Sequence, residues 1–391
     1  MVIPSVVGEL DDLGPLDRRL LHVFVTGPGR GEGIAVALPG RGWLIVDGCR
    51  VQDGSFPIDQ ALSRWRADDE DPVEALVFTH PHDDHAAGIP RVIERHRPRR
   101  IAISVPDPPG PAFLAEVVAH SSSAGTTSNR LDADAVRSAA AAIQRWSVEN
   151  PGALVTACDG VSLEVRSAAT VSIRAPDVVA LGTFMNARGL ERRIRARGNE
   201  ISAVVEVVFG ATCVVLGGDL PRVRPGGKST VKTGWDRVLH RHGHLGRHHG
   251  LKVPHHGSRE AQHGGLMTTR VPEVAREWWV TPHNSSRLPR LAAGDGLDRL
   301  LVQQSPICLT ALPAALSVQA AAPGAWRIQR DQLVRRLEAQ ATGDPFIDGG
   351  IELRPGSACG VLDAVWCGAF DDAGHLVGRW RGPAALELVS A

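Results

Sequence analysis

The segment FTHPHDDHAAG, at residues 78–88, constrains the fold of this chain more than any other feature. It follows an apolar strand pattern and precedes small residues that open a helical pattern. His80 and His82, one residue apart at a strand end, can bind one divalent metal from two directions. Asp84 and His85, on the turn that follows, can reach a second metal nearby. Imidazole and carboxylate ligands together suit zinc, and also manganese or iron. The segment therefore predicts a strand that ends in a metal-binding turn.

The composition is that of a folded protein with a large core. Of the 391 residues, 43% are hydrophobic and 22% are charged, which excludes intrinsic disorder. The 43 basic residues balance the 43 acidic ones, which excludes a uniformly basic surface but not a local basic patch. No apolar run reaches the ~18 residues of a membrane helix, and the start of the chain lacks the features of a secretory signal. The six cysteines form no CxxC pair. We therefore expect a cytoplasmic protein with reduced thiols and no membrane association.

Short apolar runs bounded by turn residues predict strands through most of the chain. These runs cover residues 19–27, 33–40, 42–48, 73–80, 153–157, 161–167, 169–176, 201–219, 250–257, 276–282 and 305–312. Helical periodicity occurs at 86–96 and 128–146. This order favours one α/β sandwich over alternating βαβ units. We expect one domain over 1–314, with residues 315–391 as a β-rich extension packed on it, where PGAWRI, GGIELRPG and DAVWCGAF suggest extra strands.

Two later fragments add residues that suit the same metal site. CVVLGGDL, at residues 213–220, ends a strand in Asp219, which is well placed as a carboxylate that bridges two metals. Considered alone, Asp219 is equally suited to a helix cap or a turn. LKVPHHGS, at residues 251–258, ends the next strand in His255 and His256. The order of the two fragments therefore favours a ligand role for Asp219.

The motifs together resemble those of the metallo-β-lactamase-fold hydrolase superfamily: HxHxDH, an apolar strand that ends in GD, and KVPHHGS. Within it, the chain is similar to the hydrolase domain of ComEC-type DNA-uptake competence proteins and their free-standing relatives. The fragments that carry this narrower likeness are GPGRGEGIAVALPGRGWLIVDG, GNEISAVVEVVFG, KVPHHGS and WVTPHNSSRLPR. The resemblance covers about residues 20–312. It implies a four-layer αββα sandwich with a dinuclear metal site at one edge of the two sheets.

The resemblance also implies a role for each matching residue. The implied ligands are His80 and His82 for the first metal, Asp84 and His85 for the second, and Asp219 as the bridge, with His256 rather than His255 as the final ligand. A hydroxide that bridges the metals would attack in line, oriented by Asp84 and Asp219. His255 is then a candidate for contacting a substrate phosphate or for protonating the leaving group. His283, Asn284 and Lys252 are candidates for substrate binding.

For other residues of the implied site, more than one role is consistent with the sequence. Asp47, at the end of WLIVDG, matches an Asp that precedes the first ligand motif. It is expected either to support a ligand His or to form the turn after its strand. Many members of the superfamily supply a further His to the first metal from the middle of the chain, but here only His96 and His120 occur there, in other contexts. Asn199 or Glu200 stands at the sequence position where this further ligand of the first metal would be expected. The first metal is therefore expected to be weakly held or to need substrate to complete its coordination.

The insertion between the strands of Asp219 and His256 is basic. Residues 222–259 carry nine Lys or Arg and one acid. Because the insertion joins two ligand strands, we expect it beside the metals, where it can hold a polyanion backbone; a solvated face is the alternative. The segment 240–250 is rich in histidine, but its spacing matches no ligand pattern, so it predicts a solvated loop near the site.

Three classes of function follow from these observations. We favour a metal-dependent phosphodiesterase or nuclease that binds two Zn or Mn ions and acts on nucleic acid or another phosphodiester. The first alternative is a hydrolase of a small ester, lactone, thioester or cyclic nucleotide, because the same fold carries all of these activities. The second is a non-catalytic binding module with a degenerate first metal site.

Overall fold

The structure is a computed structural model in which two large sheets dominate. The residues that it describes are 7–29, 31–51, 54–67, 71–104, 114–118, 130–186, 194, 197–222, 233–267, 276–290, 296–303, 307–313, 326–328, 346–348, 351–353 and 362–390. Within them the strands form two nine-stranded sheets and a separate pair, β16 (Phe346–Asp348) with β17 (Ile351–Leu353).

The first sheet contains the strands of the N-terminal part of the chain and two strands from its C-terminal part. Its order is β1-β19-β18-β2-β3-β4-β5-β6-β7. The bounds are β1 Gly8–Glu9, β2 Leu21–Thr26, β3 Gly33–Ala37, β4 Trp43–Val46, β5 Val73–Phe78, β6 Ile101–Ile103, β7 Leu154–Thr156, β18 Val365–Phe370 and β19 Leu376–Arg381. β2, β3 and β4 form an antiparallel meander, whereas β4 to β7 run parallel. The carboxyl ends of β4 and β5 therefore lie at the same edge.

The second sheet repeats this mixed arrangement. Its order is β15-β20-β14-β13-β12-β11-β10-β9-β8. The bounds are β8 Ser162–Leu163, β9 Thr170–Ala175, β10 Val204–Phe209, β11 Thr212–Leu216, β12 Gly250–Lys252, β13 Glu277–Val280, β14 Ile307–Leu309, β15 Trp326–Ile328 and β20 Leu386–Ser390. The hairpin predicted over 201–219 is the antiparallel pair β10 and β11. Strands β11 to β14 run parallel, so their carboxyl ends also share one edge.

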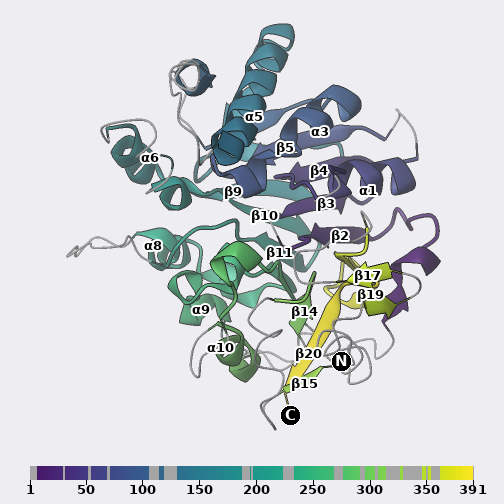
Figure 1. The fold of residues 1–391 in the computed structure, drawn as a ribbon. Helices are drawn as coiled ribbons and strands as arrows, with labels where there is room; N and C mark the ends of the chain where they lie inside the picture. Colours follow the sequence, from purple (N-terminus) through teal and green to yellow (C-terminus); the bar gives the residue numbers. More distant parts are fainter. Residues whose placement is uncertain are drawn as a thin grey trace.

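Helices cover the outer face of each sheet (Figure 1). The α-helices are α1 Pro57–Trp65, α2 Asp83–Ala86, α3 Ile89–His96, α5 Arg130–Glu149, α6 Val178–Met185, α8 Gly234–Arg241, α9 Gly264–Met267 and α10 Gly296–Gln303. Short 3₁₀ turns are η1 Leu10–Asp12, η2 Gly198–Ile201, η3 Gly243–Arg247, η4 His255–Gly257, η5 Arg259–Ala261 and η6 Asn284–Ser286. The helix predicted over 86–96 corresponds to α3, which begins after Gly88. Ala86, the first residue of the predicted range, is the last residue of α2. No helix in the described part of the chain is both long enough and apolar enough to cross a membrane.

Three hydrophobic cores separate four layers. The first lies between the first sheet and helices α1, α3 and α5, and includes Ile58, Val92 and Ile143. The second lies between the two sheets and contains Trp279, whereas the third lies between the second sheet and helices α8 to α10 and contains Trp278. Successive side chains of a strand point to opposite faces, so these adjacent tryptophans enter different cores. The predicted αββα sandwich is confirmed.

The described C-terminal strands belong to both sheets. β18 and β19 extend the first sheet beside β2, and β20 pairs with β14 in the second. Arg379 of β19 donates to Glu277 of β13 at 2.8 Å, and it also forms an ion pair with Glu387 of β20. These buried contacts connect the two sheets. The extra C-terminal strands expected from the sequence are therefore present.

Candidate metal centre

The candidate site lies where the carboxyl ends of the parallel strands of both sheets meet. Each of its loops follows a strand, apart from the loop of Glu32, which precedes β3. The residues that these loops bring together are Asp47 after β4, His80, His82, Asp84 and His85 after β5, Asp219 after β11, His255 and His256 after β12, and His283 after β13. The fold thus assembles distant segments of the sequence into one cluster.

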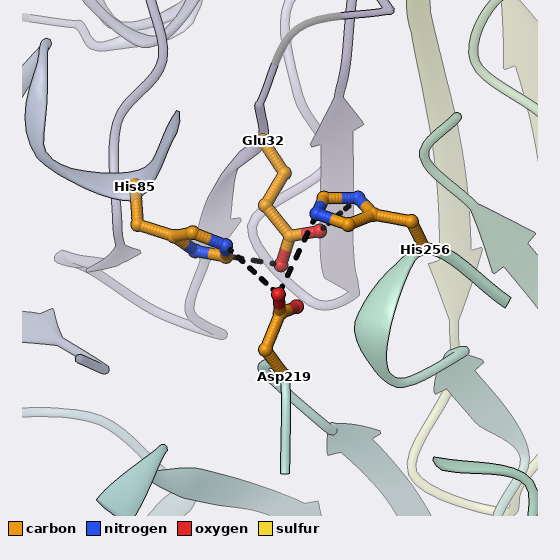
Figure 2. Close-up of side chains that lie close together, drawn as sticks. All are labelled: Glu32, His85, Asp219 and His256. Carbon is orange, nitrogen blue, oxygen red and sulfur yellow. Dashed lines mark ion pairs between the residues drawn. The ribbon is translucent and has the colours of Figure 1, made fainter. Parts of the chain in front are cut away.

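Four buried side chains form the centre of the cluster (Figure 2). Glu32, His85, Asp219 and His256 each place a possible ligand atom within 4.8 Å of the others. Asp84 belongs to the same group, because its Oδ2 lies 3.6 Å from His85 Nε2 and 3.2 Å from His256 Nε2. Asp219 Oδ2 lies 3.6 Å from each of the same two nitrogens. Two imidazoles and two carboxylates therefore surround one point.

Hydrogen bonds on the far side of each imidazole fix its tautomer. His85 Nδ1 lies 2.7 Å from Asp47 Oδ2, and His256 Nδ1 lies 2.8 Å from the carbonyl oxygen of Thr281. Because both partners are acceptors, each Nδ1 carries a proton, and each Nε2 is the ring nitrogen that faces the carboxylates and, once deprotonated, could bind a cation. His85 Nε2 is buried and has no hydrogen-bond partner within the described structure. Lone pairs and carboxylate oxygens that face one point fit a divalent cation.

The carboxylate of Glu32 lies between the imidazole rings of His85 and His256 (Figure 2). Its Oε2 accepts a hydrogen bond from Thr281 Oγ1 at 2.6 Å and pairs with the ammonium of Lys252. The imidazole nitrogens near its carboxylate are His256 Nδ1, at 3.5 Å, and His85 Nδ1, at 3.9 Å, which face away from the centre. We therefore assign Glu32 to the support of the rings and Asp84 to the ligand set. Sequence reasoning missed Glu32, although a lone acid within GRGEG before a buried strand was a possible signal.

A second pair of ligand atoms lies beside the first group. His82 Nε2 is 3.0 Å from the carbonyl oxygen of Ile194, so His82 Nδ1 is left without a proton. Thr79 Oγ1 donates to Asp47 Oδ2 at 2.6 Å and therefore accepts from His80 Nδ1 at 2.9 Å. The two unprotonated atoms, His80 Nε2 and His82 Nδ1, lie 3.1 Å apart. Two lone pairs at this distance repel unless a cation binds both.

Asp219 connects the two groups. Its Oδ2 lies 3.9 Å from His80 Nε2 on one side and 3.6 Å from both His85 Nε2 and His256 Nε2 on the other. The backbone N–H of Asp219 donates to Ser202 Oγ at 2.8 Å, which holds the start of its loop. The structure thus brings together all six residues that the sequence predicted as ligands.

The charges of the cluster favour a bound cation. Burial raises the pKa of Asp84, but His85 and His256 outweigh burial and hold that pKa well below its usual value. Burial lowers the pKa of His85, but Asp84, Asp47 and other carboxylates outweigh it and raise that pKa well above its usual value. For His80, burial, together with His85 and His82, holds the pKa well below its usual value. The second group of ligands therefore has the stronger negative potential.

The backbone of the site is strained at three residues whose side chains enter the cluster. Asp47, His255 and His256 have positive φ values of 57°, 48° and 51°, which residues with side chains seldom adopt. Gly198 is required where η2 passes His82, because a Cβ at this position would lie 2.5 Å from His82 Nε2. Such strain is concentrated where the fold must aim several side chains at one point.

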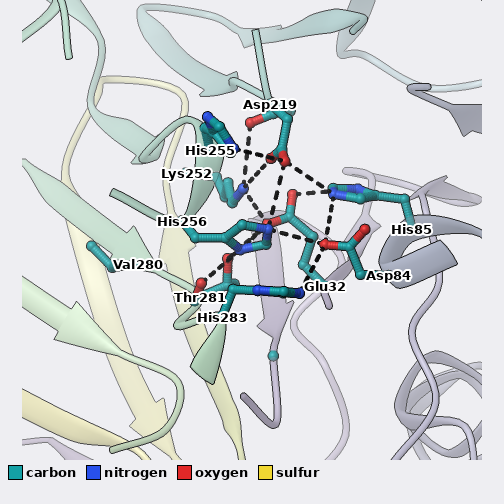
Figure 3. A network of polar contacts seen from close by, with 12 residues as sticks. Glu32, Asp84, His85, Asp219, Lys252, His255, His256, Val280, Thr281 and His283 are labelled. Carbon is teal, nitrogen blue, oxygen red and sulfur yellow. Dashed lines mark hydrogen bonds and ion pairs between the residues drawn. The ribbon is translucent and has the colours of Figure 1, made fainter. Parts of the chain in front are cut away.

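The remaining predicted residues have different surroundings. His283 borders the cluster, with Nε2 3.6 Å from Asp84 Oδ2 and 19% of its side chain exposed. Asn284 donates to the Leu312 carbonyl at 3.4 Å. Lys252 is fully buried, pairs with Glu32, and has its Nζ 4.0 Å from Asp219 Oδ1 (Figure 3).

The histidines of the middle segment lie in different places. His96 binds Asp59 at 2.8 Å, away from the site, and His120 lies outside the described residues. Asn199 approaches the cluster, and its Nδ2 lies 3.2 Å from His255 Nε2. Of the residues considered for the missing first-metal ligand, Asn199 is therefore the one that the structure places beside the other ligands.

Two arginines in the described part of the basic insertion pair with distant acids. Arg237 pairs with Asp177 and Arg241 with Asp159. His244 lies 2.8 Å from Glu206, and His248 is fully buried, where it accepts from the indole of Trp278 at 2.9 Å. The prediction of a solvated loop over 240–250 is therefore wrong for His248, because long-range packing covers it.

The chain is similar to known proteins over part of its length. Residues 34–167 match the model of a family described as the metallo-beta-lactamase superfamily. The chain is similar to the crystal structure of Zn²⁺-bound PqqB from Methylobacterium extorquens, with 12% identity, 59% of this chain and 69% of that chain covered, and a TM-score of 0.30. It is also similar to a beta-lactamase domain protein from Burkholderia ambifaria, with 16% identity, 54% and 57% covered, and a TM-score of 0.29. No curated protein matches the chain.

The matched family segment begins in β3 and includes the HxHxDH motif. The described fold adds a second sheet with Asp219 and His256 at the shared edge. Over residues 34–167 the chain is therefore similar to the metallo-beta-lactamase superfamily.

Proposed function

We propose that this protein is a phosphodiesterase that holds two divalent ions, Zn or Mn, and acts as a nuclease. One observation carries the proposal: Asp219 Oδ2 faces two ligand groups at once. His80 and His82 lie on one side, and His85 and His256 lie on the other. Two-metal sites with a shared carboxylate suit in-line displacement at phosphorus, because both the attacking and the leaving oxygen need charge stabilisation.

The two metals, when bound, supply Lewis acidity and lower the pKa of an attacking water. The chain itself supplies orientation. The carboxylates of Asp84 and Asp219 border the centre and would accept hydrogen bonds from such a water, which would orient it. His283 Nδ1 accepts from the backbone N–H of Ser286 at 3.3 Å, so its Nε2 carries a proton. This N–H points to the Asp84 side of the cluster and can donate to a phosphate oxygen.

Exposed arginines near the cluster support a polyanionic substrate. Arg259 follows the turn of His256, and Arg287 and Arg290 follow the loop of His283. The two loops touch, since a Cβ at Gly257 would lie 3.0 Å from Pro289 Cβ. No ion pair joins any of the three arginines to another residue in the part of the chain that the structure describes. Guanidinium groups at such positions can contact the phosphate oxygens of a polyanion. The resemblance of KVPHHGS and its neighbours to ComEC-type hydrolase domains points the same way.

The experiment compares substrate classes with one metal-loaded preparation. The protein, with Mn²⁺ or Zn²⁺, is incubated with plasmid, single-stranded DNA, RNA and a chromogenic phosphodiester, and separately with a carboxylic ester, a lactone and a thioester. We expect hydrolysis of the phosphodiesters, including a nucleic acid. His82→Ala should abolish it, whereas His263→Ala should not, because His263 pairs with Asp236 outside the cluster.

Each outcome separates the alternatives. Cleavage of the small diester alone would contradict the nuclease and leave a phosphodiesterase. Cleavage of only the ester, lactone or thioester would contradict the phosphodiesterase and favour another hydrolase of the same fold. No cleavage of any substrate by the metal-loaded protein would favour the non-catalytic binding module.

A further inference from the structure

We propose that His255, assisted by Asn199, completes the coordination of the first metal, whose other ligands are His80 and His82. The inference rests on the proposed two-metal function. It assigns the ligand that the sequence leaves missing, and it replaces the expected role of His255 as a group that protonates the leaving atom.

The distances around Asp219 Oδ2 carry the proposal. Four imidazole nitrogens surround this oxygen: His80 Nε2 at 3.9 Å, His85 Nε2 at 3.6 Å, His255 Nε2 at 3.9 Å and His256 Nε2 at 3.6 Å. The shorter pair belongs to the group that also contains Asp84. The longer pair, from His80 and His255, remains for the first metal. A carboxylate that bridges two metals needs a set of further ligands for each metal, one on each side of the carboxylate.

The two ligand sets then have the same construction. The second metal takes His85 from the loop after β5 and His256 from the turn after β12, with Asp84 as an additional ligand. The first metal takes His80 from the same loop and His255 from the same turn, with His82 in the corresponding place. Figure 3 shows His255 and His256 entering the cluster from neighbouring positions of one turn.

The backbone of that turn explains how two consecutive residues reach one carboxylate. In extended or helical backbone, adjacent side chains diverge. Here His255, His256 and Gly257 all have positive φ, at 48°, 51° and 75°. The backbone N–H of His255 donates to the Gly218 carbonyl at 2.9 Å, which ties the turn to the residue before Asp219. The strain of the left-handed residues is thus associated with aiming both imidazoles at Asp219.

Asn199 adjoins this first-metal group. Its amide lies 3.2 Å from His255 Nε2, and its Oδ1 is buried without a hydrogen-bond partner within the described structure. The preceding residue, Gly198, is packed directly against the ring of His82. The amide therefore lies next to two of the proposed ligands, and its oxygen can supply an additional donor to the metal or to a water on it.

The test measures metal binding directly rather than activity. Metal-free wild-type protein and its variants are dialysed against Zn²⁺ or Co²⁺, and the bound equivalents, their dissociation constants and the visible spectrum of bound Co²⁺ are recorded. His82→Ala marks the loss of the first metal, and His256→Ala the loss of the second. His263→Ala is the matched control, because 22% of its side chain is exposed against 21% for His255.

We expect two equivalents in the wild type and in His263→Ala. His255→Ala should lose the same equivalent as His82→Ala, or bind it at least about 100-fold more weakly, and should keep the Co²⁺ spectrum of the second site. Asn199→Ala should weaken the same equivalent by about 10-fold. Two equivalents with unchanged affinity in His255→Ala would overturn this inference and leave the proposed function intact. One equivalent or fewer in the wild type would overturn the proposed two-metal function itself.

Discussion

His80 Nε2 and His82 Nδ1 lie 3.1 Å apart, and the hydrogen bonds made by the opposite nitrogen of each ring leave both atoms without a proton. Two imidazole lone pairs do not bind each other. A cation bound by both nitrogens would stabilise this short approach. His85 Nε2 faces two carboxylate oxygens, which would also attract a cation. The folded cluster is organised for cations.

Metal should therefore stabilise the fold. Because the native cluster binds cations that the unfolded chain binds weakly, free metal at 1,000 times its dissociation constant should raise the free energy of unfolding by about 4 kcal/mol. Thermal denaturation with and without a chelator measures this shift. His82→Ala should show a smaller shift, and equal melting temperatures for the metal-free and the metal-loaded wild type would contradict the assignment of the cluster.

Asp47→Asn should weaken metal binding. Asp47 accepts from His85 Nδ1 and, through Thr79, fixes the tautomer of His80, so its loss disturbs ligands of both metals. We expect a decrease in metal affinity of about 10- to 100-fold. The control is Asp59→Asn, a buried acid that binds Arg95 and His96 instead. An equal loss of affinity in both variants, measured by calorimetric titration, would show that the effect is not specific to Asp47.

Lys252→Met should destabilise the protein. The Lys252 and Glu32 side chains are 0% and 2% exposed, so removal of the ammonium leaves a carboxylate buried without its partner. We expect a loss of about 3–5 kcal/mol of unfolding free energy in the metal-free protein. The double variant Glu32→Gln/Lys252→Met, which removes both charges, should recover most of this loss in urea denaturation. A double variant no more stable than Lys252→Met would contradict a coupled pair.

His248 should make the protein less stable in mild acid. Burial, with a smaller contribution from Arg276, lowers the pKa of His248 from 6.5 to about 3. The folded state therefore keeps this imidazole neutral, whereas the unfolded chain binds a proton below about pH 6.5. Stability is lost as the pH falls from about 6.5 towards 3, by about 2 kcal/mol at pH 5 from this group.

His248→Gln removes the proton difference and retains an acceptor for the indole of Trp278. Urea denaturation at pH 7 and pH 5 should show that the variant loses about 2 kcal/mol less than the wild type between these two values. The same loss in both proteins would mean that other groups carry the acid sensitivity.

The residues that the sequence singled out as ligands lie together in the fold because each stands in a short motif at a strand end. His80, His82 and His85 occur within six residues, and Asp219 and His256 each end a recognisable strand. The parallel order of β4–β5 and of β11–β12–β13 then brings these ends to one edge. Periodicity also located most strands, since their residues are buried on one or both faces.

Contacts between distant segments could not be predicted in this way. Glu32 is a single acid without a ligand-like neighbour, and its role depends on Lys252, which lies 220 positions later. The acids that pair with Arg241 and Arg237 of the basic insertion, Asp159 and Asp177, lie in distant parts of the chain, so the charge count of the insertion could not reveal these pairs. A local count of charges does not reveal partners supplied by the fold.

The most direct measurement of the central claim is a metal titration of phosphodiester hydrolysis. Metal-free protein is titrated with Mn²⁺ or Zn²⁺, and the rate on a chromogenic phosphodiester is followed for the wild type and for His80→Ala. We predict no hydrolysis without metal, a rate that reaches its plateau at about two equivalents per chain, and a loss of at least about 1,000-fold in His80→Ala. Hydrolysis that is independent of metal, or that is equal in His80→Ala and the wild type, would contradict the account.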